Sequence, residues 1–536
     1  MDDQVTQTSS TDCIEIPPAT DLAAEPWSLH KIWGLLKCFG PAAILASMSI
    51  GAGETIVVVK TGAWAHYDLL WVVLLACLVK GGSVTYMLGR YTAISGEYIG
   101  HRLVRFPGPR GWFLILIVGV EVMFAPLAWV VIAKPCGDLL HHLIGQQFFA
   151  GGIPGGMGDT FWINLFTTLF IAAALVVSLT LTYERLEKEQ LAICGILVLG
   201  TIIGTVMVWP DFGAAARGTL LRIGRFPESS PEWAPPDAVN YPWLNLATVF
   251  AYIGGSVTTY IVYANWIGLR GWGLTSHPEI EKIRQRAARS SRIDYLPDDP
   301  VQRRRLFRLT APLRWDVTLG ATVLFIVTAA FMVSGAAVLY DEQSRFEKWS
   351  LLTDQAHIWR NIHPWLTTVY YVTVIAALWG TLTALPEVYS RVAHEFSQAI
   401  WPGNRWTYSG LRRVIVVAIM VVAGPVIWCN LEFETLTQIA GFFLANLAVA
   451  AAAIAAFYLN HKLPRAYRVH GVTFAFALVS TLILVVATSM STYGLVMKLR
   501  NQFFASGDEI SARADDSPVS FQNVDTTKDF DTLTPK

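Results

Sequence analysis

A single glutamate lies in the middle of an apolar run, directly after residues that weaken a helix. The run at 39–64 reads FGPAAILASMSIGAGETIVVVKTGAW, and Glu54 follows Gly51-Ala52-Gly53 near its centre. Glycine is a poor helix former, so two glycines around an alanine favour local unwinding. A carboxylate beside freed backbone carbonyls has the chemistry to bind a cation. At membrane depth such a charge is costly and therefore indicates a functional site.

A second apolar run carries a similar interruption. The run at 244–267 reads LNLATVFAYIGGSVTTYIVYANWI, with Gly254-Gly255 at its centre and Ser256, Thr258 and Thr259 after it. These residues offer hydroxyls and open carbonyls at the same depth. Unwound backbone is tolerated in a membrane only inside protein or beside a water-filled cavity. Close helix packing is the alternative explanation, because small residues also let membrane helices approach one another.

The elements that position these residues are membrane-spanning helices. The chain has 536 residues, of which 53% are hydrophobic and only 15% charged, whereas soluble domains carry about 25% charge. A span needs about 20 mostly apolar residues. Eleven such runs are present, at 39–64, 69–93, 112–141, 160–182, 190–209, 244–267, 315–340, 364–390, 411–429, 435–459 and 470–497. The sequence therefore predicts an all-α integral membrane protein with about eleven transmembrane helices.

The two interrupted runs hold equivalent places in two five-span halves. We expect repeat one at about 39–209, repeat two at about 244–459 and an extra helix at 470–497. An odd number of spans per half makes the halves inverted. Interrupted spans at matching places in two halves are the best sequence indication of a transporter's binding site.

Charge in the loops predicts the orientation. With the N-terminus in the cytoplasm, 26 of the 40 Lys and Arg residues fall on the cytoplasmic side, in agreement with the positive-inside rule. We therefore expect a multi-pass protein of the cell (inner) membrane. Residues 1–30 and 501–536 are expected to be disordered around a transmembrane domain at 31–500, without a signal peptide. The basic loop at 270–313 is expected to be a solvated cytoplasmic connector and not a nucleic-acid contact.

Several stretches resemble the NRAMP (natural resistance-associated macrophage protein) family of divalent-metal transporters. They are GPAAILASMSIGAGETIVVVKTGAWAHYDLLWVVLLACLVKG at 40–81, LGRYTAISGEYIG at 88–100, WPDFGAAARG before the sixth span and IGGSVTTYIVY within it. The likeness covers roughly residues 35–460. It implies the LeuT-like 5+5 inverted repeat with broken helices 1 and 6, and transport of a divalent metal.

The resemblance also implies a metal site, with departures from the family pattern. The first-span motif Asp-Pro-Gly-Asn corresponds to Gly51, Ala52, Gly53 and Glu54, so the Asp is lost and the Asn is a Glu. The sixth-span motif Met-Pro-His corresponds to residues 258–260, and a carbonyl ligand falls on Gly255. The metal ligands expected from this correspondence are Glu54, Thr258, Gly255, Gly51 and Ala52. Without the methionine sulfur, oxygen ligands favour hard ions such as Mg²⁺ or Mn²⁺, and a single carboxylate suits a hydrated ion.

Three further residues are candidates along the substrate path. Tyr260 follows the second interruption, Gln438 matches a family glutamine near the metal, and Glu121 remains from the acidic residues of the family's third span. The later acidic places of that span are Pro126 and Trp129. Weak or absent proton coupling is therefore expected. A packing hydrogen bond is an equally good explanation for Gln438.

Three lysines lie inside the runs. Lys80 and Lys134 are expected to extend toward the membrane surface, as lysines near span ends usually do. Lys60 is six residues past Glu54, about 120° round a regular helix, so no direct ion pair is dictated. A Glu54–lysine pair would neutralise the site and weaken the case for a cation.

The function expected is that of a secondary transporter carrying a hard divalent cation between the broken first and sixth spans. Its partners are then the metal ion and the lipid bilayer, without nucleic acid and with protein partners unknown. One alternative is a transporter of the same fold for an organic cation or amino acid, with cation–π faces from Tyr260, Tyr252 and Tyr263. Another is a membrane sensor that does not transport. No P-loop, G-x-S-x-G or Rossmann motif is present, so neither an enzyme nor a cofactor is expected.

Overall fold

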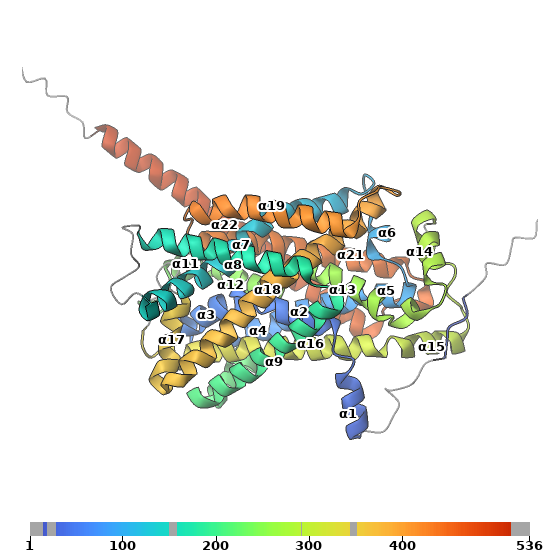
Figure 1. Ribbon diagram of the computed structural model, residues 1–536, viewed down its shortest axis with the longest axis horizontal. Coiled ribbons are helices and arrows are strands. Elements are labelled where there is room, and N and C mark those ends of the chain that lie inside the picture. Colours follow the sequence, from blue (N-terminus) through green and yellow to red (C-terminus); the bar gives the residue numbers. More distant parts are fainter. Residues whose placement is uncertain (1–13, 19–27, 149–157, 291, 344–350, 516–536) are drawn as a thin grey trace, which may run out of the picture.

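The computed structural model describes residues 14–18, 28–148, 158–290, 292–343 and 351–515. Within these ranges the protein is a bundle of long helices that lie side by side (Figure 1). Ten of the described helices are long and apolar enough to cross a membrane. The short helix α1 (Leu29–Leu36) and α2 (Pro41–Ser49), bent by 63° at their junction, form an eleventh candidate.

The first five spans follow the predicted order. Span one is α2, the π-helical turn η1 (Gly53–Val58) and α3 (Val59–Ala65), and span two is α4 (Leu70–Ala76), η2 (Cys77–Val84) and α5 (Thr85–Ser95). Spans three to five are α7 (Trp112–Phe148), α8 (Asp159–Thr180) and α9 (Tyr183–Val208).

The second half repeats this pattern. Span six is α12 (Pro242–Tyr252) and α13 (Val257–Arg270), and span seven is α16 (Ala311–Ser334) with η4 (Gly335–Leu339). Spans eight and nine are α18 (Pro364–Ile400) and α19 (Tyr408–Trp428), and span ten is α20 (Phe433–Ala440), η5 (Gly441–Leu447) and α21 (Ala448–Lys462). The extra helix is α22 (Gly471–Asp515).

The predicted second to eleventh spans are confirmed, the first is made of the three short pieces α2, η1 and α3, and the structure shows breaks in the first and sixth. Helices at the edge of the bundle expose apolar residues, as a lipid-facing surface requires. On α19, for example, Val414, Val417 and Val421 are each more than 60% exposed and recur at helical spacing. The first and sixth spans, by contrast, are buried along nearly their whole length. Residues that line the breaks are therefore shielded from lipid.

The insertion at 270–313 is not the solvated connector that its charge suggested. It folds into η3 (Gly273–Ser276), α14 (Ile280–Arg289) and α15 (Pro300–Leu309), which lie at the same end of the bundle as α5 and α6 (Ile99–Leu103) (Figure 1). Apolar side chains such as Leu274 and Leu306 are fully buried. In α14 the charged residues Glu281, Lys282 and Arg289 are exposed while Ile283 and Ala287 are buried, so the high charge of the segment hides an apolar face.

The insertion at 270–313 forms a cap that contacts, through Tyr295, a buried ion pair between Glu97 and Arg102 at the end of the second span. Arg102 donates to both carboxylate oxygens of Glu97, at 3.0 and 2.5 Å. Tyr91 and Tyr295 donate to the same carboxylate, at 2.6 and 2.9 Å. All four side chains are at most 1% exposed. Arg102 thus balances a charge that has no access to water.

Replacing Arg102 with methionine should destabilise the protein by about 3–5 kcal/mol, because Glu97 is left buried without its partner charge. The thermal melting of the detergent-purified protein, followed by tryptophan fluorescence, measures the effect. Arg110→Met is the matched control, since Arg110 is exposed and its loss should leave the melting temperature unchanged. Equal melting of the two variants would contradict this account of the cap.

The two ends of the chain differ in part from expectation. Residues 14–18 lie against the cap, where the backbone N–H of Ile14 donates to the carbonyl of Tyr295 at 3.1 Å and Ile16 is fully buried. At the other end α22 continues to Asp515, past the predicted end at 497. The expected disorder at 1–13, 19–27 and 516–536 concerns positions outside the described residues.

Candidate functional site at the breaks of the first and sixth spans

The break in the first span begins where α2 ends. Ile50 leaves the helical conformation, with φ −77° and ψ 75°, and the helix resumes with the wider turn η1 at Gly53. The side chain of Glu54 supports this turn by accepting a hydrogen bond from the backbone N–H of Gly51 at 3.1 Å. The carboxylate therefore satisfies a backbone donor that unwinding has freed.

The break in the sixth span requires glycine. Gly254 has φ +95°, in the region that only glycine adopts without strain. The backbone N–H of the next residue, Gly255, donates to the Tyr260 hydroxyl at 3.0 Å. After Ser256 the helix resumes as α13.

Glu54 links the two breaks. Its second oxygen, Oε1, accepts from the backbone N–H of Gly254 at 3.0 Å, and the side chain is fully buried. The backbones meet closely here, because a Cβ added to Gly53 would lie 2.1 Å from the carbonyl oxygen of Tyr252. One carboxylate thus joins the unwound segments of both spans.

Side chains from other spans cap the broken helix ends. Lys80 of η2 donates to the carbonyls of Phe250 and Ala251 at the end of α12, at 2.7 and 2.8 Å. Glu121 of α7 accepts from the backbone N–H and hydroxyl of Thr258 at the start of α13, at 3.3 and 2.9 Å. A cation therefore stands at a helix C-terminus and an anion at an N-terminus, as the helix dipole favours.

A cavity of about 90 Å³ lies between the breaks and spans three, eight and ten, with room for several water molecules. Its described lining includes no charged side chain and is mostly glycine, alanine and hydroxyl residues. The hydroxyl-bearing residues are Ser49, Tyr252, Ser256, Thr259, Thr381 and Tyr389. The hydroxyls of Ser49 and Tyr252 are buried without a hydrogen-bond partner among the described residues. The cavity thus offers neutral oxygens, and the charges of Glu54 and Lys80 stand behind its wall.

Some of the residues expected at the site line the cavity, and others make hydrogen bonds that stabilise the second break. Gly51, Ala52 and Gly255 line the cavity. Thr258 instead donates to Glu121, and Tyr260 accepts from Gly255. Both side chains therefore hold the second break in shape.

Gln438 does not line the cavity. It donates to Asp237 of α11 (Pro236–Asn240) at 2.7 Å and accepts from Lys498 of α22 at 2.9 Å. A packing role, which the sequence left open for it, agrees with these contacts. Within the described residues no group of three or more His, Cys, Asp or Glu is arranged to hold a metal ion.

Sequence reasoning missed several residues at the site, among them Met48, Thr381 and Lys80. Met48 and Thr381 line the cavity, and Thr381 also donates to the carbonyl of Met48 at 3.0 Å. The expectation that Lys80 reaches the membrane surface is wrong, because its side chain is fully buried. The position of Lys80 next to Gly81-Gly82 within an apolar run was the available signal, and only tertiary structure decides where such a lysine points.

The other two intramembrane lysines have partners remote from Glu54. Lys60 pairs with Glu434 at the start of α20 and not with Glu54. The lysine whose charge lies near Glu54 is Lys80, on the other side of Gly254. Lys134 donates to the carbonyl of Ile427 at 3.2 Å and to Asn430 at 3.0 Å.

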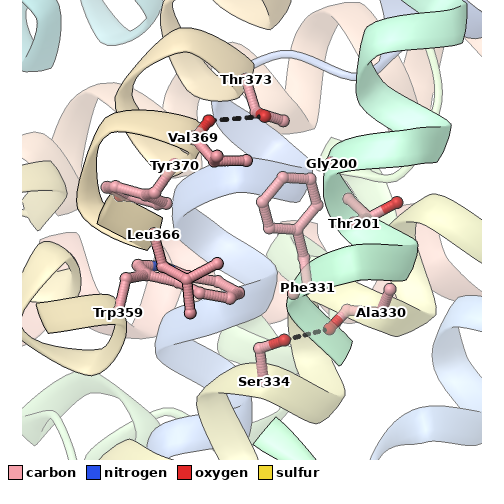
Figure 2. Close-up of a pocket in the computed structure, with 11 residues that line it drawn as sticks. Gly200, Thr201, Ala330, Phe331, Ser334, Trp359, Leu366, Val369, Tyr370 and Thr373 are labelled. Carbon is pink, nitrogen blue, oxygen red and sulfur yellow. Dashed lines mark hydrogen bonds between the residues drawn. The ribbon is translucent and has the colours of Figure 1, made fainter. Parts of the chain in front are cut away.

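A second, smaller cavity lies between α9, α16, α17 (Leu351–Ile362) and α18. Figure 2 shows its aromatic wall of Phe331, Trp359 and Tyr370. The hydroxyls of Ser334 and Thr373 donate to carbonyls of their own helices (Figure 2). This cavity presents an apolar surface without a charged group in its described lining and does not compete as the candidate site.

Comparison with known proteins gives both a family match and structural matches. The model of the family described as natural resistance-associated macrophage protein-like matches residues 42–494. The crystal structure of the Eremococcus coleocola manganese transporter in complex with an aromatic bis-isothiourea compound is 16% identical, with a TM-score of 0.57 over 90% of this chain and 91% of that chain. A mutant of that transporter matches at 15% identity and a TM-score of 0.56, over 92% and 91%. No curated protein matches the sequence.

Proposed function

The chain belongs to the NRAMP family, whose LeuT-like fold it shares, and on that premise we propose that it carries a hard divalent cation, Mg²⁺ or Mn²⁺, between its broken first and sixth spans. The observation that carries the proposal is the Glu54 carboxylate, which contacts the unwound backbone of both spans. A cation bound near Glu54 would therefore interact, through this carboxylate, with the unwound segments of both spans.

The donors around the cavity support a hard ion. Hydroxyls, carbonyls and a carboxylate suit Mg²⁺ or Mn²⁺, while Met48 is the one thioether in the described lining. The orphan hydroxyls of Ser49 and Tyr252 are free to bind water. An ion that keeps part of its hydration shell would therefore be held through water by neutral oxygens, with Glu54 behind them balancing its charge.

The mechanism proposed is alternating access. Spans one, two, six and seven rock against the rest around the cavity, by analogy with the fold. Glu121 caps α13 through Oε1 alone, and Pro126 and Trp129 stand where the family has further acidic residues in the third span. We therefore propose that proton coupling is weak or absent. The N-terminus and the cap at 270–313 are placed on the cytoplasmic side of the cell (inner) membrane, from the loop charges.

A second candidate is a small organic cation or amino acid. The observation that favours it is the uncharged lining, in which Tyr252 and Tyr389 offer aromatic faces. Three tyrosines were expected to offer cation–π faces. Of these, Tyr260 accepts a hydrogen bond from Gly255 and Tyr263 donates one to Asp316.

Uptake into proteoliposomes tests the proposal. Mn²⁺ should enter liposomes that contain the protein faster than empty liposomes, and excess Mg²⁺ should compete while methylammonium should not. Competition by methylammonium or by amino acids, with Mg²⁺ without effect, would instead favour the second candidate.

A further inference from the structure

Lys80 is the one lysine among the described residues that reaches the breaks. It lies in η2 of span two and is fully buried. Two of its three ammonium hydrogens are directed at Phe250 and Ala251, the last-turn carbonyls of α12. The nitrogen also lies 5.1 Å from the centre of the Phe250 ring, where a cation is favoured. The charge is thus held at a fixed place beside the break.

The same nitrogen stands close to the backbone that binds Glu54. A Cβ added to Gly254 would lie 3.8 Å from Lys80 Nζ, and the N–H of Gly254 is the donor to Glu54 Oε1. Lys80 and Glu54 therefore both lie against one glycine. Their formal charges cancel, so an arriving cation meets the attraction of one and the repulsion of the other in a poorly screened interior.

Carbonyls at the end of a broken half-helix are the groups that coordinate diffusible cations in transporters with interrupted spans. In this chain the ammonium already donates to two of them. The alternative of a lysine reaching for the membrane surface is excluded by its complete burial.

We infer that Lys80 is a built-in cation of the transport site, which holds the place of a diffusible co-ion at the end of α12 and competes with the cargo cation for Glu54. The inference rests on the proposed function. It makes Lys80 a residue that sets specificity by charge. Since Coulomb repulsion scales with the charge of the cargo, Lys80 weakens binding of a divalent cation more than of a monovalent one.

The test is binding of Mn²⁺ and of methylammonium to the purified full chain, measured by isothermal titration. Lys80→Gln removes the charge and keeps an N–H donor for the α12 carbonyls. It should bind Mn²⁺ at least about tenfold more tightly than the unmodified protein, with a smaller gain for methylammonium. Combining it with Glu54→Gln should abolish the gain. Lys134→Gln is the matched control, because Lys134 contacts Ile427 and Asn430, and should leave binding unchanged.

Unchanged or weaker Mn²⁺ binding by a folded Lys80→Gln protein would overturn the inference, and so would an equal gain with Lys134→Gln. If the Lys80→Gln protein does not fold, Mn²⁺ uptake by the unmodified protein still tests the inference. With a built-in cation, replacing all Na⁺ and K⁺ by N-methylglucamine should leave Mn²⁺ uptake unchanged, and dependence on either ion would contradict the inference. Failure of the proposed function is distinguishable, because the unmodified protein would then transport no Mn²⁺ under any ionic condition.

Discussion

Replacing Glu54 with glutamine is expected to lower Mn²⁺ uptake about 100-fold while the protein stays folded. Glutamine retains one acceptor oxygen, but its amide nitrogen cannot accept from the N–H of Gly51 or Gly254. One charge-assisted hydrogen bond is worth about 1.5–3 kcal/mol, and about 3 kcal/mol corresponds to a factor of about 100. Loss of the negative charge removes the attraction for the cargo as well. Initial uptake rates in proteoliposomes at matched protein density measure the effect.

Glu189→Gln is the matched control for this substitution. Glu189 is an acidic residue of α9 that accepts a hydrogen bond from the hydroxyl of Thr383 at 3.3 Å, and it does not line the cavity. Its variant should retain full uptake. If Glu54→Gln transports as fast as the control, Glu54 has no part in the mechanism.

Replacing Gly53 with alanine should have the second largest effect. The added Cβ would lie 2.1 Å from the oxygen and 2.8 Å from the carbon of the Tyr252 carbonyl, and backbone atoms cannot move aside as a flexible side chain can. The two unwound segments must separate, which breaks the bridge that Glu54 makes between them. We expect uptake to fall at least about tenfold, with a lower melting temperature, since overpacking of this kind costs about 1–3 kcal/mol.

Gly119→Ala controls for the general effect of alanine in a membrane helix. Nothing lies within 4 Å of the Cβ that this change would add to α7, so neither uptake nor melting should change. Wild-type transport by Gly53→Ala would mean that close contact of the two breaks is unnecessary.

Much of the architecture is predictable from the sequence because the bilayer imposes it. Apolar runs of the required length mark the spans, and paired glycines mark the interruptions at 51–53 and 254–255. These are local signals, since unwinding depends on the residues at the break itself. A carboxylate inside an apolar run is equally visible, and this is why Glu54 is recognisable before its partners are known.

The partners are not predictable, because they come from spans distant in sequence. Nothing local directs Lys80 to the end of α12, 170 positions away, or Glu121 to the start of α13. Gln438 occupies the place that the family pattern gives to a residue near the metal, yet it contacts Asp237 and Lys498. The prediction of a solvated connector at 270–313 is wrong for a related reason. The many basic residues of this segment dominate its composition, and its apolar face becomes apparent only when it is buried on folding.

The location of a bound Mn²⁺ ion tests the central claim most directly. Anomalous diffraction from crystals grown with Mn²⁺ should give a peak in the cavity between the two breaks, beside Gly51 and Gly255. A peak at another place, with the cavity empty at saturating Mn²⁺, would contradict the account.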